Sequence, residues 1–182
     1  MKKLRKVIFL DIDGVLQPGG NQERFDHDLE KLREDLAVKY NNKVYLEMDR
    51  YDLGAVYYDW DKAAVERLRK LCSEVPAEIV ISSAWRRSKP LPRMKDCFKL
   101  HNMDMYVTGE IPQIPEKGRC HEITVYLNEH KDIERFVILD DDNDYDFRAN
   151  YPGQFVYCPY VFNDECYQKA LDILTKPVDA VT

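Results

Sequence analysis

Residues 6–20 read KVIFLDIDGVLQPGG and join a strong strand signal to a pair of like charges. Val7 to Leu10 form a continuous β-favouring run, which is typical of a strand buried on both faces of a parallel sheet. Asp11 and Asp13 follow directly and alternate, so both can point from the strand tip toward one place. An acidic turn is the simple alternative, but two carboxylates that close repel each other unless a cation lies between them. Mg²⁺ is the common choice of cation where a phosphate completes the ligand set.

Four similar apolar runs predict the remaining strands, at 78–82, 105–108, 136–139 and 155–158. Between them lie segments whose apolar residues recur at helical spacing, namely AAVERLRKLC (63–72), EITVYLNEH (122–130) and YQKALDIL (167–174). Short apolar strands that alternate with helices predict an α/β fold with a parallel sheet and right-handed crossovers.

The stretch from residue 17 to 58 does not follow this alternation. It contains a charged, helix-like piece, HDLEKLREDLAVKY (27–40), and two segments, 43–48 and 54–59, that we expect to pair as a short hairpin. Ligands bind at the carboxyl ends of the strands in such sheets, so an insertion after the first strand is a candidate lid. The tyrosines between Tyr40 and Tyr58, with Trp60, are expected to pack this insertion; the alternative is an aromatic wall of a substrate pocket.

Length and composition favour one domain over residues 1–182. The net charge of −6 argues against a surface that coats nucleic acid generally, although it leaves room for a local basic patch. The five cysteines are odd in number and lack metal-type spacing, so we expect reduced thiols in a cytoplasmic protein. The first apolar run is too short for export or for a membrane span.

Polar groups also follow the later predicted strands. The segment LDDDNDYD (139–146) carries four of its aspartates at positions 140, 141, 142 and 144, and if its strand neighbours the first one, both acid clusters converge on one metal. The segment ISSAWRR (81–87) supplies two hydroxyls and two cations at the same sheet edge. Lys117 and Arg119 begin a predicted helix, where a cation and a helix N-terminus together suit a phosphate.

These segments, in this order, resemble the four motifs of the haloacid dehalogenase (HAD) superfamily of phosphohydrolases. More narrowly, LDIDGVLQP, SSAWR, GRCHEI and VILDDD are similar to the HAD phosphatase domain of multifunctional (Swiss army knife) RNA repair proteins. The likeness covers about residues 7–174, except the insertion. It implies a HAD-like, Rossmannoid three-layer sandwich with a parallel sheet of about five strands in the order 5-4-1-2-3, and a small cap at about 17–58.

The resemblance also implies roles for the residues after the first strand. Asp11 would be the nucleophile that becomes an aspartyl phosphate, and Asp13 the general acid and later the general base. The Asp11 carboxylate and the Asp13 backbone carbonyl would be Mg²⁺ ligands. Gly14 would let the chain turn sharply beside the substrate.

For the phosphate-binding hydroxyl we favour Ser83, with Ser82 as the alternative, because a slip of one residue in the strand boundary exchanges them. For the phosphate-binding cation we favour Arg119, through its R-x-x-E-I context, over Lys117. Arg86 is either a salt-bridge or surface residue, or it grips the substrate phosphate. Trp85 beside it is expected to pack under the loop, with base stacking as the alternative.

Among the later acids, Asp141 is the expected Mg²⁺ ligand and Asp140 the next. Asp144 would fill a further acidic position of the family, and Asp142 is expected to be solvated. The four histidines share no spacing that would bind zinc, and each is read as a helix-face residue.

The implied activity is Mg²⁺-dependent hydrolysis of a phosphomonoester, either at the 3′ or 5′ end of an RNA or DNA strand or on a small metabolite or nucleotide. A non-catalytic HAD-like binding module is the second hypothesis, and the intact Asp11 and Asp13 pair argues against it. The chain has no Walker-type G-x-x-x-x-G-K-[ST] segment, so we expect it either to work alone or to meet kinase or ligase partners in trans. Nothing in the pattern indicates a membrane partner or fixes the oligomeric state.

Overall fold

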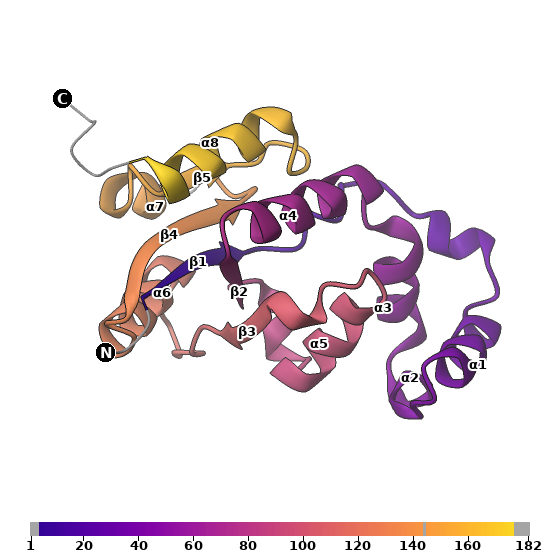
Figure 1. Cartoon of the computed structure of the whole chain (residues 1–182). Helices are drawn as coiled ribbons and strands as arrows, with labels where there is room; N and C mark the ends of the chain where they lie inside the picture. The colour runs from indigo at the N-terminus through magenta and orange to yellow at the C-terminus, as the bar shows by residue number, and fades with distance from the viewer. Residues whose placement is uncertain (1–3, 144, 177–182) are drawn as a thin grey trace.

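The computed structural model describes residues 4–143 and 145–176. At its centre lies a parallel sheet of five strands in the order β3-β2-β1-β4-β5 (Figure 1). The strands are β1 (Arg5–Leu10), β2 (Ala77–Ile81), β3 (Val107–Glu110), β4 (Ile133–Asp140) and β5 (Phe155–Tyr157). The order confirms the expected one, read from the opposite edge.

Helices cover both faces of the sheet and confirm the three-layer arrangement (Figure 1). One face packs against α4 (Lys62–Glu74), α5 (Leu91–Lys99) and α8 (Asp164–Thr175). The other packs against α6 (Arg119–Glu129) and α7 (Tyr145–Asn150). The prediction of a strand at 105–108 was two residues early, because Asp104–Tyr106 form a 3₁₀ turn, η4, in which Met105 is 66% exposed.

Alternation along the two central strands determines what their tips face. Val7 and Phe9 pack on the α6 side of β1, and the alternate residues pack on the opposite side. In β4, Ile138 also packs on the α6 side. Because the side-chain period of a strand is two, Asp11 and Asp140 fall on the α6 side as well. The sheet therefore presents both carboxylates to the start of the helix that covers this face.

The segment between β1 and α4 is helical where it was expected to form a hairpin. Its elements are η1 (Glu23–Asp26), α1 (Leu29–Lys39), α2 (Val44–Glu47), α3 (Arg50–Gly54) and a π-helical turn, η2 (Ala55–Asp59). The charged helix expected at 27–40 is confirmed as α1, whereas the hairpin of 43–48 with 54–59 is wrong. The Asp49 side chain accepts hydrogen bonds from the backbone N–H groups of Tyr51 and Asp52, so the supposed turn is the N-cap of α3.

This helical insertion, called the cap below, is docked on α5 and on the loop that precedes it. The Tyr45 hydroxyl donates to the Asp96 carbonyl at 3.2 Å, and Lys89 lies 2.7 Å from Asp52 of α3. Tyr45 and Trp60 are buried, in agreement with the packing role expected of the aromatic residues. In the described part of the chain, no helix combines the length and apolar character that crossing a membrane requires.

Candidate active site

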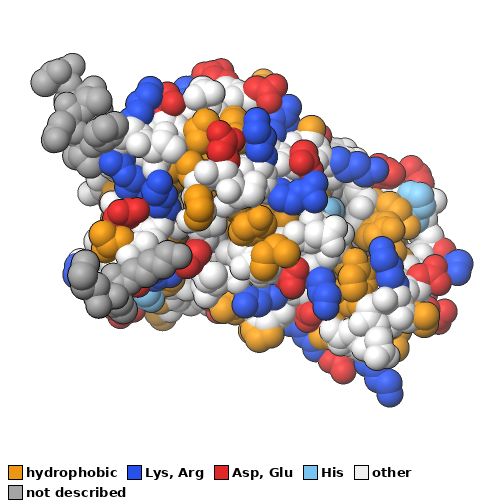
Figure 2. Space-filling model, in the orientation of Figure 1, with side chains coloured by type: hydrophobic (Ala, Val, Ile, Leu, Met, Phe, Trp, Pro, Cys, Tyr) orange, Lys and Arg blue, Asp and Glu red, His pale blue; other side chains and the backbone are white. Residues whose placement is uncertain are grey.

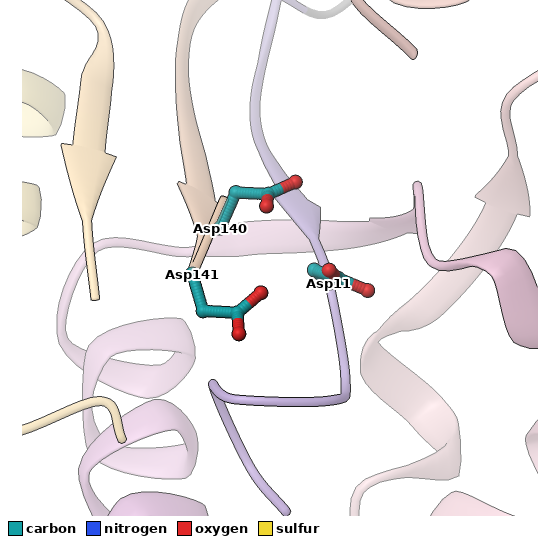
Figure 3. A group of neighbouring side chains, drawn as sticks. All are labelled: Asp11, Asp140 and Asp141. Atoms are coloured by element: carbon teal, nitrogen blue, oxygen red, sulfur yellow. The ribbon is translucent and has the colours of Figure 1, made fainter. Parts of the chain in front are cut away.

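Three carboxylates meet at the carboxyl ends of β1 and β4 (Figure 3). Leu10 pairs with Leu139 across the two strands, and the Asp11 N–H donates to the Leu139 carbonyl at 3.0 Å, so Asp11 and Asp140 lie side by side. One carboxylate oxygen from each of Asp11, Asp140 and Asp141 lies within 4.8 Å of the others. The convergence of the two acid clusters, expected from the sequence, is therefore present in the structure.

The chemistry of this cluster fits a divalent cation. Burial, and next the charge of Asp11, raises the pKa of Asp140 to about 8. The buried Asp140 Oδ2 accepts no hydrogen bond from the described residues, although Arg119 Nη1 lies 2.9 Å away. Three carboxylates around one guanidinium leave an excess of negative charge, and oxygen donors are what Mg²⁺ and Ca²⁺ prefer. Asp11, Asp140 and Asp141 are thus able to hold such an ion.

Arg119 is the cation that the fold brings to these carboxylates. It is the first residue of α6, where its Nη1 donates to Asp11 Oδ2 and its Nη2 donates to Asp140 Oδ1 at 3.1 Å. Burial alone would lower the pKa of Arg119. The charges of Asp11 and Asp140 together raise this pKa by more than burial lowers it, so the guanidinium stays charged. Lys117, the alternative, is exposed two residues before the helix. Asp142 is mostly exposed and lies 3.7 Å from Arg119, and Asp144 falls outside the described residues.

Gly14 occupies a position where any side chain would be strained and would displace a neighbouring carboxylate. Its φ is +72°, in the left-handed region that favours glycine. A Cβ at this position would lie 2.0 Å from Asp141 Oδ2. The glycine therefore makes room for Asp141 beside the turn that carries Asp11 and Asp13.

The two serines after β2 have different surroundings. Val80 packs on the α6 side of the sheet, so the period of two places Ser82 on the side of Asp11 and Ser83 on the other. The Ser82 hydroxyl oxygen is buried with no hydrogen-bond partner among the described residues. The Ser83 hydroxyl instead accepts the Trp85 N–H at 3.4 Å and caps η3 (Ala84–Arg87). Of the two hydroxyls, that of Ser82 is therefore the one on the side of Asp11, and that of Ser83 is occupied by the cap of η3.

Asp13 lies near Asp11 and has a partner that the sequence did not suggest. The indole Nε1–H of Trp85 donates to Asp13 Oδ2 at 2.9 Å. Burial is the largest influence on the pKa of Asp13 and raises it. The hydrogen bond from Trp85 lowers the pKa and the charge of Asp11 raises it, and the net pKa lies above the usual value of an aspartate. A carboxyl with a raised pKa is suited to carry a proton. No motif links positions 13 and 85, so this contact could be found only from the fold.

Arg86 lies in the protein interior, in an ion pair that occupies its guanidinium. The residue is only 2% exposed, and its guanidinium pairs with the buried Glu122 of α6. Its Nη1 also donates to the Ser82 and Ser83 carbonyls, at 2.7 and 2.8 Å. The salt-bridge alternative is thus the correct one. Glu122, which was not singled out from the sequence, also accepts the Ile114 N–H at 2.9 Å and so ties two loops to α6.

Fold and site together define a doubly wound α/β protein with an acidic cluster at the carboxyl edge of its sheet. Residues 7–161 match the family described as the HAD domain in Swiss Army Knife RNA repair proteins. The chain belongs to this family, which confirms the resemblance and the HAD-like fold. Comparisons with curated proteins and with solved structures found no match.

We predict that Gly14→Ala disturbs the cluster directly. The left-handed backbone costs an alanine about 1–2 kcal/mol, and the new methyl group displaces the Asp141 carboxylate. Urea unfolding and a Mg²⁺ titration should show lower stability and weaker ion binding. Gly19→Ala is the matched control, because a Cβ there meets no atom within 4 Å. Equal effects of the two substitutions would contradict the assigned role.

We also predict that Arg86→Met lowers the free energy of unfolding by about 3–5 kcal/mol, because it leaves the Glu122 carboxylate buried and unpaired. Urea denaturation measures this loss. Arg87→Met, at the exposed neighbour, should change stability by less than about 0.5 kcal/mol. Arg86→Met combined with Glu122→Leu should recover part of the loss; a double variant no better than the single one would count against the ion pair.

Proposed function

We propose that the protein is a Mg²⁺-dependent phosphomonoester hydrolase that acts through a phosphorylated Asp11. One observation carries the proposal: a nearly buried nucleophile, Asp11, is bridged by Arg119 to Asp140, beside Asp141. The membership of a HAD domain family supports it. Residues 1–182 would work as one domain, with 17–58 as its cap, in the cytoplasm.

The Asp11 carboxylate attacks phosphorus, and the bond from phosphorus to the leaving oxygen breaks. Asp13 donates its proton to that oxygen as it departs. In the second half, Asp13 takes a proton from the water that attacks the aspartyl phosphate. This step frees inorganic phosphate and returns Asp11 and Asp13 to their starting states.

The other residues hold the phosphoryl group and balance its charge. Arg119 donates to phosphoryl oxygens whose charge spreads in the transition state. The Ser82 hydroxyl, buried and without a partner, donates to another of these oxygens. The carboxylates of Asp11, Asp140 and Asp141 and the Asp13 carbonyl would hold Mg²⁺, which when bound offsets the charge between nucleophile and phosphate. Gly14 keeps this space open.

As substrate we propose a phosphorylated RNA or DNA end. The support is the occurrence of the family in RNA repair proteins. Acidic and basic side chains are interspersed over the visible face of the molecule (Figure 2). The chain has a net charge of −6, so recognition would rest on the phosphate end at the site more than on general attraction to the nucleic-acid backbone. Kinase and ligase partners would act in trans.

We expect the wild type to hydrolyse p-nitrophenyl phosphate with Mg²⁺ and to lose this activity in EDTA. Asp11→Asn should be inactive, because an amide cannot form the aspartyl phosphate. Asp35→Asn, which removes an exposed carboxylate on α1, is the control and should retain wild-type turnover. Release of p-nitrophenol measures all three. A folded wild type that is inert with every divalent ion would support the binding module instead.

A substrate panel tests the second half of the proposal. Single-stranded oligonucleotides with a 3′-phosphate or a 5′-phosphate should be hydrolysed with higher kcat/KM than nucleotides or sugar phosphates. Phosphate release measures each rate. Higher kcat/KM for a nucleotide or sugar phosphate would identify a small-molecule phosphatase, and equal, slow rates on all would contradict a preference for nucleic-acid ends.

A further inference from the structure

The contact between Trp85 and Asp13 joins the site to the loop after β2. Trp85 is half-buried in η3, and its indole N–H points to Asp13 Oδ2 at 2.9 Å. Its backbone N–H donates to the Ser83 hydroxyl, and its ring centroid lies 6.2 Å from that of the buried Trp60. The position of Trp85 is thus restrained both by the hydrogen bond of its backbone N–H and by the contact of its ring with Trp60.

The cap adds a third restraint on the same ring. Lys89 Nζ lies 4.4 Å from the Trp85 ring centroid, which is a cation–π distance. The same ammonium group lies 2.7 Å from Asp52 Oδ2 of α3, and the Lys89 side chain is only 13% exposed. Asp52 of the cap therefore fixes a cation over the indole that contacts Asp13.

The hydrogen bond also determines which oxygen of Asp13 can carry a proton. An indole N–H is a donor only. Asp13 Oδ2 is therefore the acceptor, and because a carbonyl oxygen accepts better than a hydroxyl oxygen, the contact favours Oδ1 as the site of a proton on this carboxyl group. A carboxylic acid whose proton favours one oxygen, and whose other oxygen is bonded to a restrained ring, is oriented for proton transfer from the free oxygen.

We infer that Trp85 is a positioning residue for Asp13, the proposed general acid. Through Lys89, which lies over the Trp85 ring, and Asp52, which pairs with Lys89, the orientation of Trp85 depends on the cap. The inference rests on the proposed function, because it assigns Trp85 a part in the protonation of the leaving oxygen. Trp85 acts through Asp13, and Lys89 covers its ring. Its task is orientation, and base stacking is not required.

The test compares leaving groups in Trp85→Phe, which keeps an aromatic ring and removes the N–H. Departure of an alkoxide needs a proton from Asp13, whereas p-nitrophenolate leaves with little help. The value of kcat/KM reports this first half of the reaction. We expect it to fall about 10–100-fold for an alkyl phosphate and by less than about threefold for p-nitrophenyl phosphate, within the range of general acid catalysis.

Two controls separate positioning from a loss of structure. Trp60→Phe keeps an aromatic ring beside Trp85 and removes only an Nε1–H that is buried without a hydrogen-bond partner among the described residues, so it should affect both substrates alike. In an Asp13→Asn background, Trp85→Phe should cause no further selective loss, because the group it orients is gone. Lys89→Met should cause a smaller selective loss on the alkyl phosphate than Trp85→Phe, and Lys89→Arg, which keeps the positive charge, should retain the wild-type rate. The two Lys89 variants serve as the test if Trp85→Phe does not fold.

The outcomes distinguish this inference from the function on which it rests. A wild type that hydrolyses both substrates, with variants that lose both rates equally, overturns the positioning role and leaves the hydrolase intact. Selective loss that persists in the Asp13→Asn background also overturns it. A folded wild type inert on both substrates overturns the proposed function and the inference with it.

Discussion

The repulsion between two neighbouring carboxylates is the constraint around which this molecule is organised. Parallel pairing of β1 and β4 sets Asp11 next to Asp140 at a buried strand end, where water cannot screen their charges. Arg119 reaches both groups only because α6 begins on the side of the sheet to which they point. The burial that forces the charges together also leaves this edge of the sheet with three acidic groups around one guanidinium, a donor set that a divalent cation would fit.

Much of the fold could be read from the sequence because its signals are local and strong. The apolar runs predicted five strands, and two carboxylates behind the first run indicated the site; the strand order came from the resemblance. The hairpin failed because Asp49 begins a helix by capping, which competes with the turn that the same residue type favours. The sequence favoured Ser83 over Ser82 only narrowly, since the choice depends on a strand end that periodicity does not locate to one residue.

The residues that were missed or misassigned share a physical reason. Arg86 looked like a surface cation because arginine is seldom buried, and only the fold supplies Glu122 as its partner. Trp85 and Lys89 make contacts to residues far away in the sequence, with Asp13 and Asp52. Long-range partners of this kind leave no pattern in a single chain, and here they contact the carboxylates and the loops that the pattern singled out.

The central place of β1 in the sheet has a consequence for biosynthesis. This strand leaves the ribosome before either of its neighbouring strands. Leu10 cannot pair until Ile81 of β2 and Leu139 of β4 have also been synthesised. Contacts that span so much sequence form slowly, and an apolar strand that waits for partners is open to aggregation. Asp11 therefore meets Asp140 only after the end of β4 has emerged, so nascent chains that stop before Asp140 cannot assemble the acidic cluster.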